Sequence, residues 1–187
     1  TLDMSDFVQD AITHYVNVTK SDREPKIAQT PFCPPGSLLA SDWEVVGELE
    51  KGCHSVVMKN MWVARTARPD LIKPCNDLAS HLQKWSRNCD KYIARTIGYM
   101  KRSKDFTLKG YVGDPLTDCE LWLFVDADFC GEAEHTKSTS GCWLVLVGPN
   151  TCYHIISPGA VVSKAPLPAP LLKRSPSRSQ WDSSKCQ

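Results

Sequence analysis

The stretch VDADFCGEAEHTKSTSGCWLVLV, residues 125–147, decides the fold. It begins at the end of an apolar run, residues 121–125, and Asp126 and Asp128 follow at once. A short apolar run bounded by polar residues predicts a buried strand. A carboxylate at the end of such a strand is costly unless it is paired or binds a cation. The stretch therefore predicts a strand that ends in an acidic site, a polar turn and a second strand at residues 142–147.

The residues before about position 105 show helical periodicity. Apolar side chains recur three or four positions apart in residues 3–18, which predicts a first helix. A second helix is expected at residues 48–66 and a third from Pro69 to residue 85, bent or delayed by Pro74. Ser86 can cap a fourth helix, whose inner apolar stripe is Ile93, Ile97 and Met100.

After Lys104 the period changes to the alternation of strands. Apolar or alternating runs predict four strands, at residues 106–112, 120–125, 142–147 and 151–156. The last two are expected to pair across the Gly-Pro-Asn turn at residues 148–150. Helices followed by an antiparallel sheet define an α+β protein. The expected domains are a helical region, a sheet and a tail, at residues 1–110, 111–157 and 158–187.

Charge is segregated along the chain, although the net charge is only +1. Residues 51–104 carry twelve Lys and Arg against three Asp and Glu, whereas residues 105–157 carry two against eight. A basic block beside an acidic one is typical of a protein that holds a polyanion on one region and metal ions on another. The alternative is that these charges only solvate exposed helix faces.

Composition favours an intracellular protein, cytoplasmic or nuclear. No apolar run approaches the about 20 residues that a membrane span needs, and the first residues show no signal-peptide pattern. The nine cysteines are irregularly spaced and contain no CxxC pair. This spacing favours scattered reduced thiols over zinc ligands or a disulfide framework.

Segments along the chain resemble, in the same order, segments of copia-type retrotransposon Pol polyproteins. DADFCG, followed by KSTSG and an apolar run, resembles the start of their ribonuclease H domain. MWVARTARPDL, residues 61–71, resembles the segment that follows the polymerase palm. YIARTIGYMKRSKDFTLKG, residues 92–110, resembles the segment that reads RILRYLKGTKDYGL in the family. FVQDAITHY and IAQTPF, residues 7–15 and 27–32, resemble an upstream portion.

The resemblance implies a helical region like a polymerase thumb or connection, followed by the first half of a ribonuclease H-like domain. In the family, two Mg²⁺ ions held by about four carboxylates cleave the RNA strand of an RNA–DNA hybrid. Asp126 matches the first metal-bridging aspartate, on the central strand, and is the expected metal ligand and catalytic residue. Asp128 matches the second acid of the DAD motif, for which a turn acid that accepts backbone N–H bonds is the alternative. The YxDD pair of the polymerase palm is nowhere in the chain.

The basic helical block matches a thumb, which holds a primer–template or an RNA–DNA hybrid by its phosphates. Such sequence-independent contacts come from Lys and Arg, and the candidates are Arg65, Arg68, Lys91, Arg95, Lys101, Arg102 and Lys104. For Arg68 the alternative is a local ion pair with Asp70 that organises the turn around Pro69. Trp62 and Trp85 are expected in the core rather than as base-stacking platforms. Other parts of the same polyprotein are further expected partners.

Residues 158–187 depart from the family, which reads roughly W-x-S-K-[KR]-Q and then S-[ST]-x-E-A-E on a helix. This tail has five prolines and one acid. Triplets shifted across the codons of Pro158/Gly159, Leu172/Lys173 and Arg174/Ser175 can spell the family's Trp and its two Glu in register. We therefore expect an out-of-frame reading, with a Pro/Ser-rich disordered tail as the alternative. Either way, no regular packed structure is expected from residue 158 onward.

The sequence as a whole predicts a fragment of such a polyprotein, ancestrally for RNA-directed DNA synthesis and hybrid cleavage. As written it is expected to be inactive, because the later carboxylates of the two-metal site are missing. The alternatives are a non-catalytic nucleic-acid-binding module, in which only the basic helices still work, and an unexpressed relic that does not fold stably.

Overall fold

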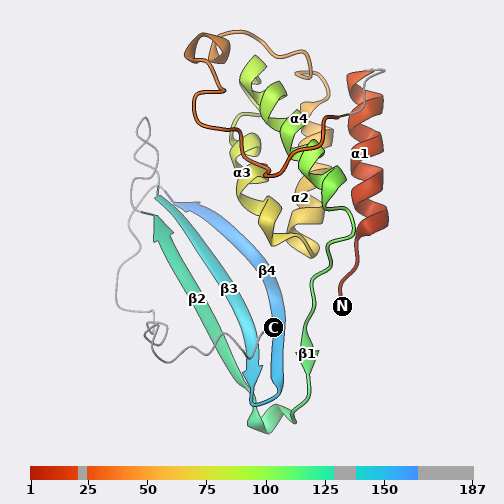
Figure 1. Ribbon diagram of the computed structural model, residues 1–187. Helices are drawn as coiled ribbons and strands as arrows, with labels where there is room; N and C mark the ends of the chain where they lie inside the picture. The colour runs from red at the N-terminus through yellow and green to blue at the C-terminus, as the bar shows by residue number, and fades with distance from the viewer. Residues whose placement is uncertain (21–24, 129–137, 164–187) are drawn as a thin grey trace. The chain divides into compact units, whose positions relative to one another are not determined.

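The computed structural model describes residues 1–20, 25–128 and 138–163, with the backbone alone at 126–128, 138–140 and 154–163. The chain divides into two units, one of residues 2–108 and one that begins at residue 109. Among the described residues, the first holds four α-helices and the second holds a four-stranded antiparallel sheet (Figure 1). The fold class is therefore α+β, as predicted, and each unit is described by itself.

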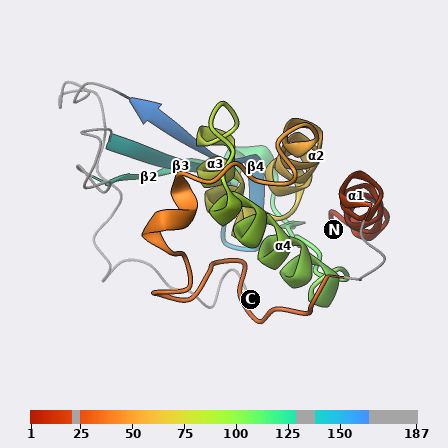
Figure 2. The same cartoon turned by 90° about the horizontal axis from the view of Figure 1, so that it is seen from above.

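The helical unit is built from the four helices and two short 3-10 turns. The helices are α1 (Ser5–Thr19), α2 (Cys53–Thr66), α3 (Ile72–Ser80) and α4 (Arg87–Arg102), and the 3-10 turns span Ala40–Trp43 and Pro69–Leu71. α2 lies between α1 and α3, while α4 packs against both of these helices (Figure 2). The predicted inner stripe of α4 is confirmed, because Ile93, Ile97 and Met100 are fully buried.

The start of α2 lies later than the sequence predicts, at Cys53 rather than about residue 48. The backbone N–H groups of Glu48 and Leu49 donate to the carboxylate of Asp90, over 2.6 and 3.2 Å, instead of entering a helix. The same carboxylate accepts the indole N–H of Trp85 over 2.7 Å. Asp90 thus holds the segment before α2 against the start of α4.

The limits of α3 and α4 also show how local chemistry ends or starts a helix. α3 ends at Ser80 rather than residue 85, because the N–H of His81 closes a tighter turn. Pro74 lies in the first turn of α3, where its missing N–H does little harm. Ser86 precedes α4, as predicted, but its hydroxyl lies 3.4 Å from Cys89 Sγ and caps no backbone N–H.

The proline-rich connector, residues 25–39, is held along α4 by backbone and side-chain hydrogen bonds. The N–H of Ala28 donates to the carbonyl of Gly98 over 3.3 Å, and the side-chain amide of Asn88 donates to the carbonyl of Leu39 over 2.7 Å. A Cβ on Gly98 would collide with a backbone carbonyl of the connector, so glycine permits this close approach.

The sheet has the strand order β1-β4-β3-β2. Its strands are β1 (Tyr111–Val112), β2 (Glu120–Asp128), β3 (Ser138–Gly148) and β4 (Thr151–Ser163). β2 and β3 pair in a register that sets Leu123 opposite Leu144, and β3 and β4 form a hairpin closed by the pair Gly148↔Thr151. The three predicted strands from residue 120 onward are therefore confirmed in position.

Two predictions about the strands are wrong. The expected strand at residues 106–112 is reduced to β1, because the backbone of Leu108 pairs with Leu2 of the helical unit instead. β2 is not a buried strand, since Leu121 and Leu123 are 64% and 44% exposed. It also lies at one edge of the described sheet, where it pairs only with β3, rather than at the centre.

The predicted loss of regular structure at residue 158 is also wrong for its first residues. β4 continues to Ser163, which pairs with Ser138 of β3. Pro158 falls at a register shift, between the pairs Cys142↔Gly159 and Leu144↔Ile156, where a ladder N–H is not required. Residues 164–187, which hold most of the expected out-of-frame tail, lie outside the described residues.

All but one of the described cysteines carry reduced thiols, as the sequence predicts. Six of the described cysteines are not in a disulfide: Cys33, Cys53, Cys75, Cys89, Cys119 and Cys142. Cys152 on β4 is disulfide-bonded, so the prediction of reduced thiols is wrong there. Over the described ranges, no helix combines the length and the apolar character needed to cross a membrane.

Candidate nucleic-acid interface

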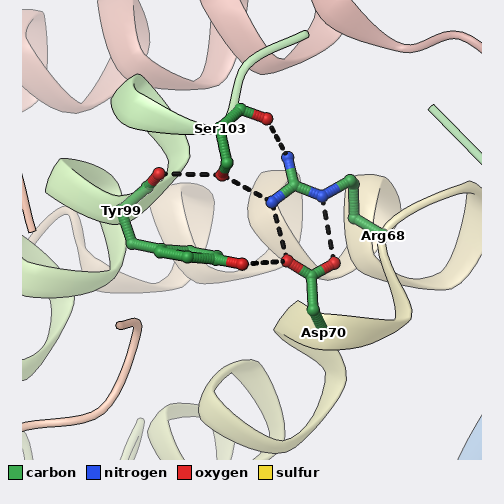
Figure 3. Close-up of polar contacts among 4 residues, drawn as sticks. All are labelled: Arg68, Asp70, Tyr99 and Ser103. Carbon is green, nitrogen blue, oxygen red and sulfur yellow. Dashed lines mark hydrogen bonds and ion pairs between the residues drawn. The ribbon is translucent and has the colours of Figure 1, made fainter. Parts of the chain in front are cut away.

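Arg68, at the turn between α2 and α3, is buried, with 1% of its surface exposed. Its guanidinium donates to both carboxylate oxygens of Asp70, from Nε to Oδ1 over 3.0 Å and from Nη2 to Oδ2 over 2.7 Å. It also donates to Ser103 just after α4, from Nη1 to the carbonyl over 2.8 Å and from Nη2 to the hydroxyl over 2.7 Å (Figure 3). These bonds use four of the five N–H donors of the guanidinium.

Tyr99 completes this group, which we call the Arg68 network: Arg68, Asp70, Tyr99 and Ser103. The phenol donates to Asp70 Oδ2 over 2.8 Å, and the hydroxyl of Ser103 donates to the Tyr99 carbonyl over 2.8 Å (Figure 3). Burial first, and then the bond to the Asp70 carboxylate, raise the pKa of Tyr99, so the phenol remains a neutral donor. The Arg68 Cζ also lies 5.7 Å from the centre of the Tyr99 ring.

The geometry of the network bears directly on Arg68 as a candidate phosphate ligand. Its side chain faces Asp70 and Ser103 inside the protein. The alternative arrangement, a local ion pair around Pro69, is the one present in the structure. We therefore leave Arg68 out of the candidate interface.

Two further candidates, Lys91 and Arg95, hold the 3-10 turn before α2 and the connector against α4. The ammonium of Lys91 lies 2.6 Å from Oδ2 of Asp42, which is itself buried. The guanidinium of Arg95 donates to the carbonyl of Phe32 and, over 3.0 Å, to the hydroxyl of Thr30. Lys91 and Arg95 therefore have structural partners that a phosphate would have to displace.

The remaining candidates gather at one end of the helical unit. Arg65, Arg102 and Lys104 are exposed, and within the described residues none of them forms an ion pair or a side-chain hydrogen bond. We call these three the basic end. Lys101 is half-buried and has an interaction partner, so it is not included.

The Arg68 network explains why the basic end comes together. Arg65 lies in the last turn of α2, three residues before Arg68, and Arg102 and Lys104 flank Ser103 after α4. Because Arg68 bonds Ser103, the C-terminal ends of the two helices meet there. Cations at helix C-termini also stabilise the helix dipole, which gives Arg65 and Arg102 a structural role of their own.

Trp62 contradicts its predicted place in the core, because 61% of its surface is exposed. Trp85 is buried, as predicted. The helical period already held this information, since the buried face of α2 contains Val57, Met61 and Ala64, and position 62 points away from them. The indole of Trp62 is thus exposed one turn before Arg65. The expectation that a tryptophan lies in the core missed this surface feature.

The acidic candidates lie on β2. Asp126 pairs with Gly141 and Asp128 with Thr139 in the β2–β3 register, and their side chains lie outside the described residues. Among the side chains that are described, no group of three or more His, Cys, Asp or Glu could hold a metal ion. We derive no catalytic step through Mg²⁺.

Comparison with known proteins does not name a family for the chain. No protein-family model, no curated protein and no solved structure matches it. The resemblance to copia-type polyproteins therefore remains a prediction that depends on the segments quoted above.

Proposed function

We propose that the chain is a segment of a copia-type retrotransposon Pol polyprotein whose helical unit binds nucleic acid by its phosphates. The observation that carries this proposal is the Arg68 network. Arg68 and Asp70 come from the segment at residues 61–71, and Tyr99 and Ser103 come from the segment at residues 92–110. Two stretches that resemble the family separately in sequence thus meet through their own polar side chains.

A third segment of the resemblance joins the same unit. The IAQTPF stretch, residues 27–32, is bonded to α4 through Arg95, and the hydroxyl of Thr96 donates to the carbonyl of Pro31 over 3.3 Å. If the sequence had changed without selection for the fold, these polar residues would not be expected to form such contacts. The contacts support a common origin of the segments as one folded unit.

Phosphate binding is assigned to the basic end. Arg65, Arg102 and Lys104 are exposed cations without described partners, and Arg can hold a phosphate through two parallel N–H bonds. The expected ligand is an RNA–DNA hybrid or a primer–template, bound without sequence preference and with a strong dependence on salt. A thumb or connection region of a polymerase requires this kind of contact.

Cleavage of the hybrid is not part of the proposal. The resemblance assigns about four carboxylates to two metal ions, and the sequence after residue 157 holds a single acid, Asp182. Asp126 and Asp128 are then ancestral residues of a site that the chain as written does not complete.

The test is equilibrium binding of a labelled RNA–DNA hybrid to the full chain, followed by fluorescence anisotropy between about 50 and 200 mM salt. The variant R65Q/R102Q/K104Q should bind more weakly, and the slope of log affinity against log salt should fall by up to about 3, near 0.9 per lost duplex phosphate contact. A matched control is Lys20→Gln: Lys20 is exposed and follows the C-terminal end of α1, a helix about 22 Å long, whereas Leu2, before its N-terminal end, pairs with Leu108, close in sequence to the basic end.

Circular dichroism melts of the variants separate binding from folding, because the substitutions at the helix ends remove favourable dipole interactions. The proposal fails if the wild-type chain binds no hybrid at about 50 mM salt. It also fails if the triple variant and Lys20→Gln lose equal affinity. Magnesium-dependent cleavage that Asp126→Asn abolishes would restore the catalytic function left out here.

A further inference from the structure

The exposed face of α2 extends the basic end with an aromatic and apolar surface. His54, Met58, Trp62 and Arg65 are all exposed. Their spacing of four, four and three residues places them along one side of the helix. α1 and α3 flank α2 (Figure 2), and its buried residues, such as Val56 and Val63, lie on the opposite side.

This face of α2 carries basic but no acidic side chains from its own helix. α2, with the sequence CHSVVMKNMWVART, contains no Asp or Glu. The ammonium of Lys59 lies 3.8 Å from Asp10 of α1, at the margin of the face. Trp62 and Arg65 therefore stand together without an acidic side chain from their own helix.

Scattered exposed apolar side chains are normal and need no explanation by themselves. Phe7 on α1 is such a case: it is 52% exposed, with Asp6 directly before it and Asp10 three residues after it. A polyanion would be repelled there, whereas the same kind of exposed ring on α2 stands beside a cation. The charge around the ring is what distinguishes Trp62.

We propose that Trp62 is a stacking platform for an unpaired base of a single-stranded nucleic acid, whose adjoining phosphate is bound by Arg65. This inference rests on the proposed function and assigns a binding residue to the unpaired strand of a primer–template. Bases inside a duplex are covered by their neighbours on both faces, whereas an unpaired base offers an open face to an indole. Stacking of this kind tolerates any base and accompanies a positively charged track for the backbone.

The experiment compares a labelled oligo(dT) strand with a blunt duplex of equal length, using anisotropy and the full chain. Trp62→Ala should weaken single-strand binding on the order of tenfold and leave duplex binding unchanged. Trp62→Phe should recover most of the loss, because it keeps an aromatic face. Phe7→Ala is the matched control and should have no effect on either ligand.

Salt dependence adds a second readout that separates the two residues. Trp62→Ala should keep the wild-type salt slope, because stacking releases no counterion. Arg65→Gln should reduce the slope on the single strand by about 0.7. A change of slope in Trp62→Ala would show that its loss is not one of stacking.

The outcomes distinguish this inference from the function on which it rests. If Trp62→Ala binds oligo(dT) like the wild type, while the R65Q/R102Q/K104Q variant loses hybrid binding, the platform is refuted and the proposed function stands. If the wild type binds neither ligand, both fall. Equal losses on single strand and duplex, or a dimer in sedimentation that Trp62→Ala dissociates while oligo(dT) binding is unchanged, would also overturn the platform.

Discussion

The helical unit and the sheet differ in how far apart in sequence their holding contacts lie. In the helical unit, Arg68 bonds Ser103, 35 positions later, and Asp90 bonds Glu48, 42 positions earlier. In the described sheet most of the pairing joins consecutive strands, β2 with β3 and β3 with β4, and the distant contacts are those that the short β1 and the loop after it make with the β3–β4 turn and the start of β4. Contacts between distant segments fix a unique arrangement, whereas neighbouring strands need only turns. The helical unit is therefore held together mainly by contacts between segments that lie far apart in the sequence.

The largest expected effect on stability comes from a core residue of the helical unit, compared with a more exposed residue of the sheet. Ile97, at the centre of α4, is fully buried, whereas Leu123 on β2 is 44% exposed. Ile97→Ala should reduce the free energy of unfolding of the helical unit by about 2–5 kcal/mol, through lost transfer energy and the cavity that remains. Leu123→Ala should cost clearly less, because its side chain already contacts solvent.

Hydrogen exchange of the full chain, followed by mass spectrometry of its peptides, measures these two changes in their own units. Peptides of α4 report on Ile97→Ala, and peptides of β2 and β3 report on Leu123→Ala. Equal losses would mean that β2 is buried in solution and that the contrast between the units is wrong.

A second effect is expected at Arg68, whose replacement should reduce the free energy of unfolding of the helical unit by about 2–3 kcal/mol. Arg68→Met keeps most of the side-chain volume but leaves Asp70 and Ser103 without their charged partner, and breaking a buried pair costs more than it ever contributed. The estimate lies below the about 3–5 kcal/mol expected for a fully buried pair, because the Asp70 side chain is 34% exposed and solvent screens its charge.

Urea unfolding of Arg68→Met measures this loss, with Arg65→Met as the control for an exposed arginine of α2. Arg68→Lys should recover little, because an ammonium cannot supply the forked set of donors. Similar stabilities for Arg68→Met and Arg65→Met would remove the Arg68 network as the contact that joins the two segments.

The sequence predicted what depends on local periodicity and missed what depends on distant partners. α1, the inner stripe of α4 and the β3–β4 hairpin follow from patterns within about 20 residues. The late start of α2 could not be foreseen, because the acceptor for Glu48 lies on another helix. The exposure of Leu121 was missed because an apolar run looks the same whether or not its face is covered.

The candidate site divides in the same way. The Asp70 partner of Arg68 was open to sequence reasoning because it lies two residues away, but Ser103 was not. Lys91 and Arg95 were taken as phosphate ligands because their partners lie far away in sequence, Asp42 in the 3-10 turn before α2 and Phe32 in the connector. Among the residues that the sequence reasoning misplaced, Trp62 is the one whose exposure could have been predicted, from its position relative to the buried face of α2.

The smallest effect is expected at Asp114, which ties the loop after β1 to the β3–β4 turn. Its carboxylate accepts the backbone N–H of Asn150 over 2.7 Å and the side-chain amide over 3.1 Å. The hydroxyl of Thr151 accepts the N–H groups of Gly113 and Asp114, each over 3.1 Å. Although desolvation raises it, the hydrogen bonds leave the pKa of Asp114 below its ordinary value of 3.8.

A lowered pKa in the folded state means that the charged carboxylate stabilises the sheet above pH 3.8 and that this contribution is lost as the pH falls through the lower, folded value. Hydrogen exchange of the β3–β4 turn between pH 7 and about pH 3 should therefore show protection that declines at the acid end. Asp114→Asn should lower protection at neutral pH and flatten that decline. Asp118→Asn is the matched control, because among the described residues the Asp118 carboxylate accepts a hydrogen bond only from the neighbouring Thr117 hydroxyl. Parallel pH profiles for Asp114→Asn and the wild type would show that this carboxylate does not hold the turn, and the sheet would then depend on strand pairing alone.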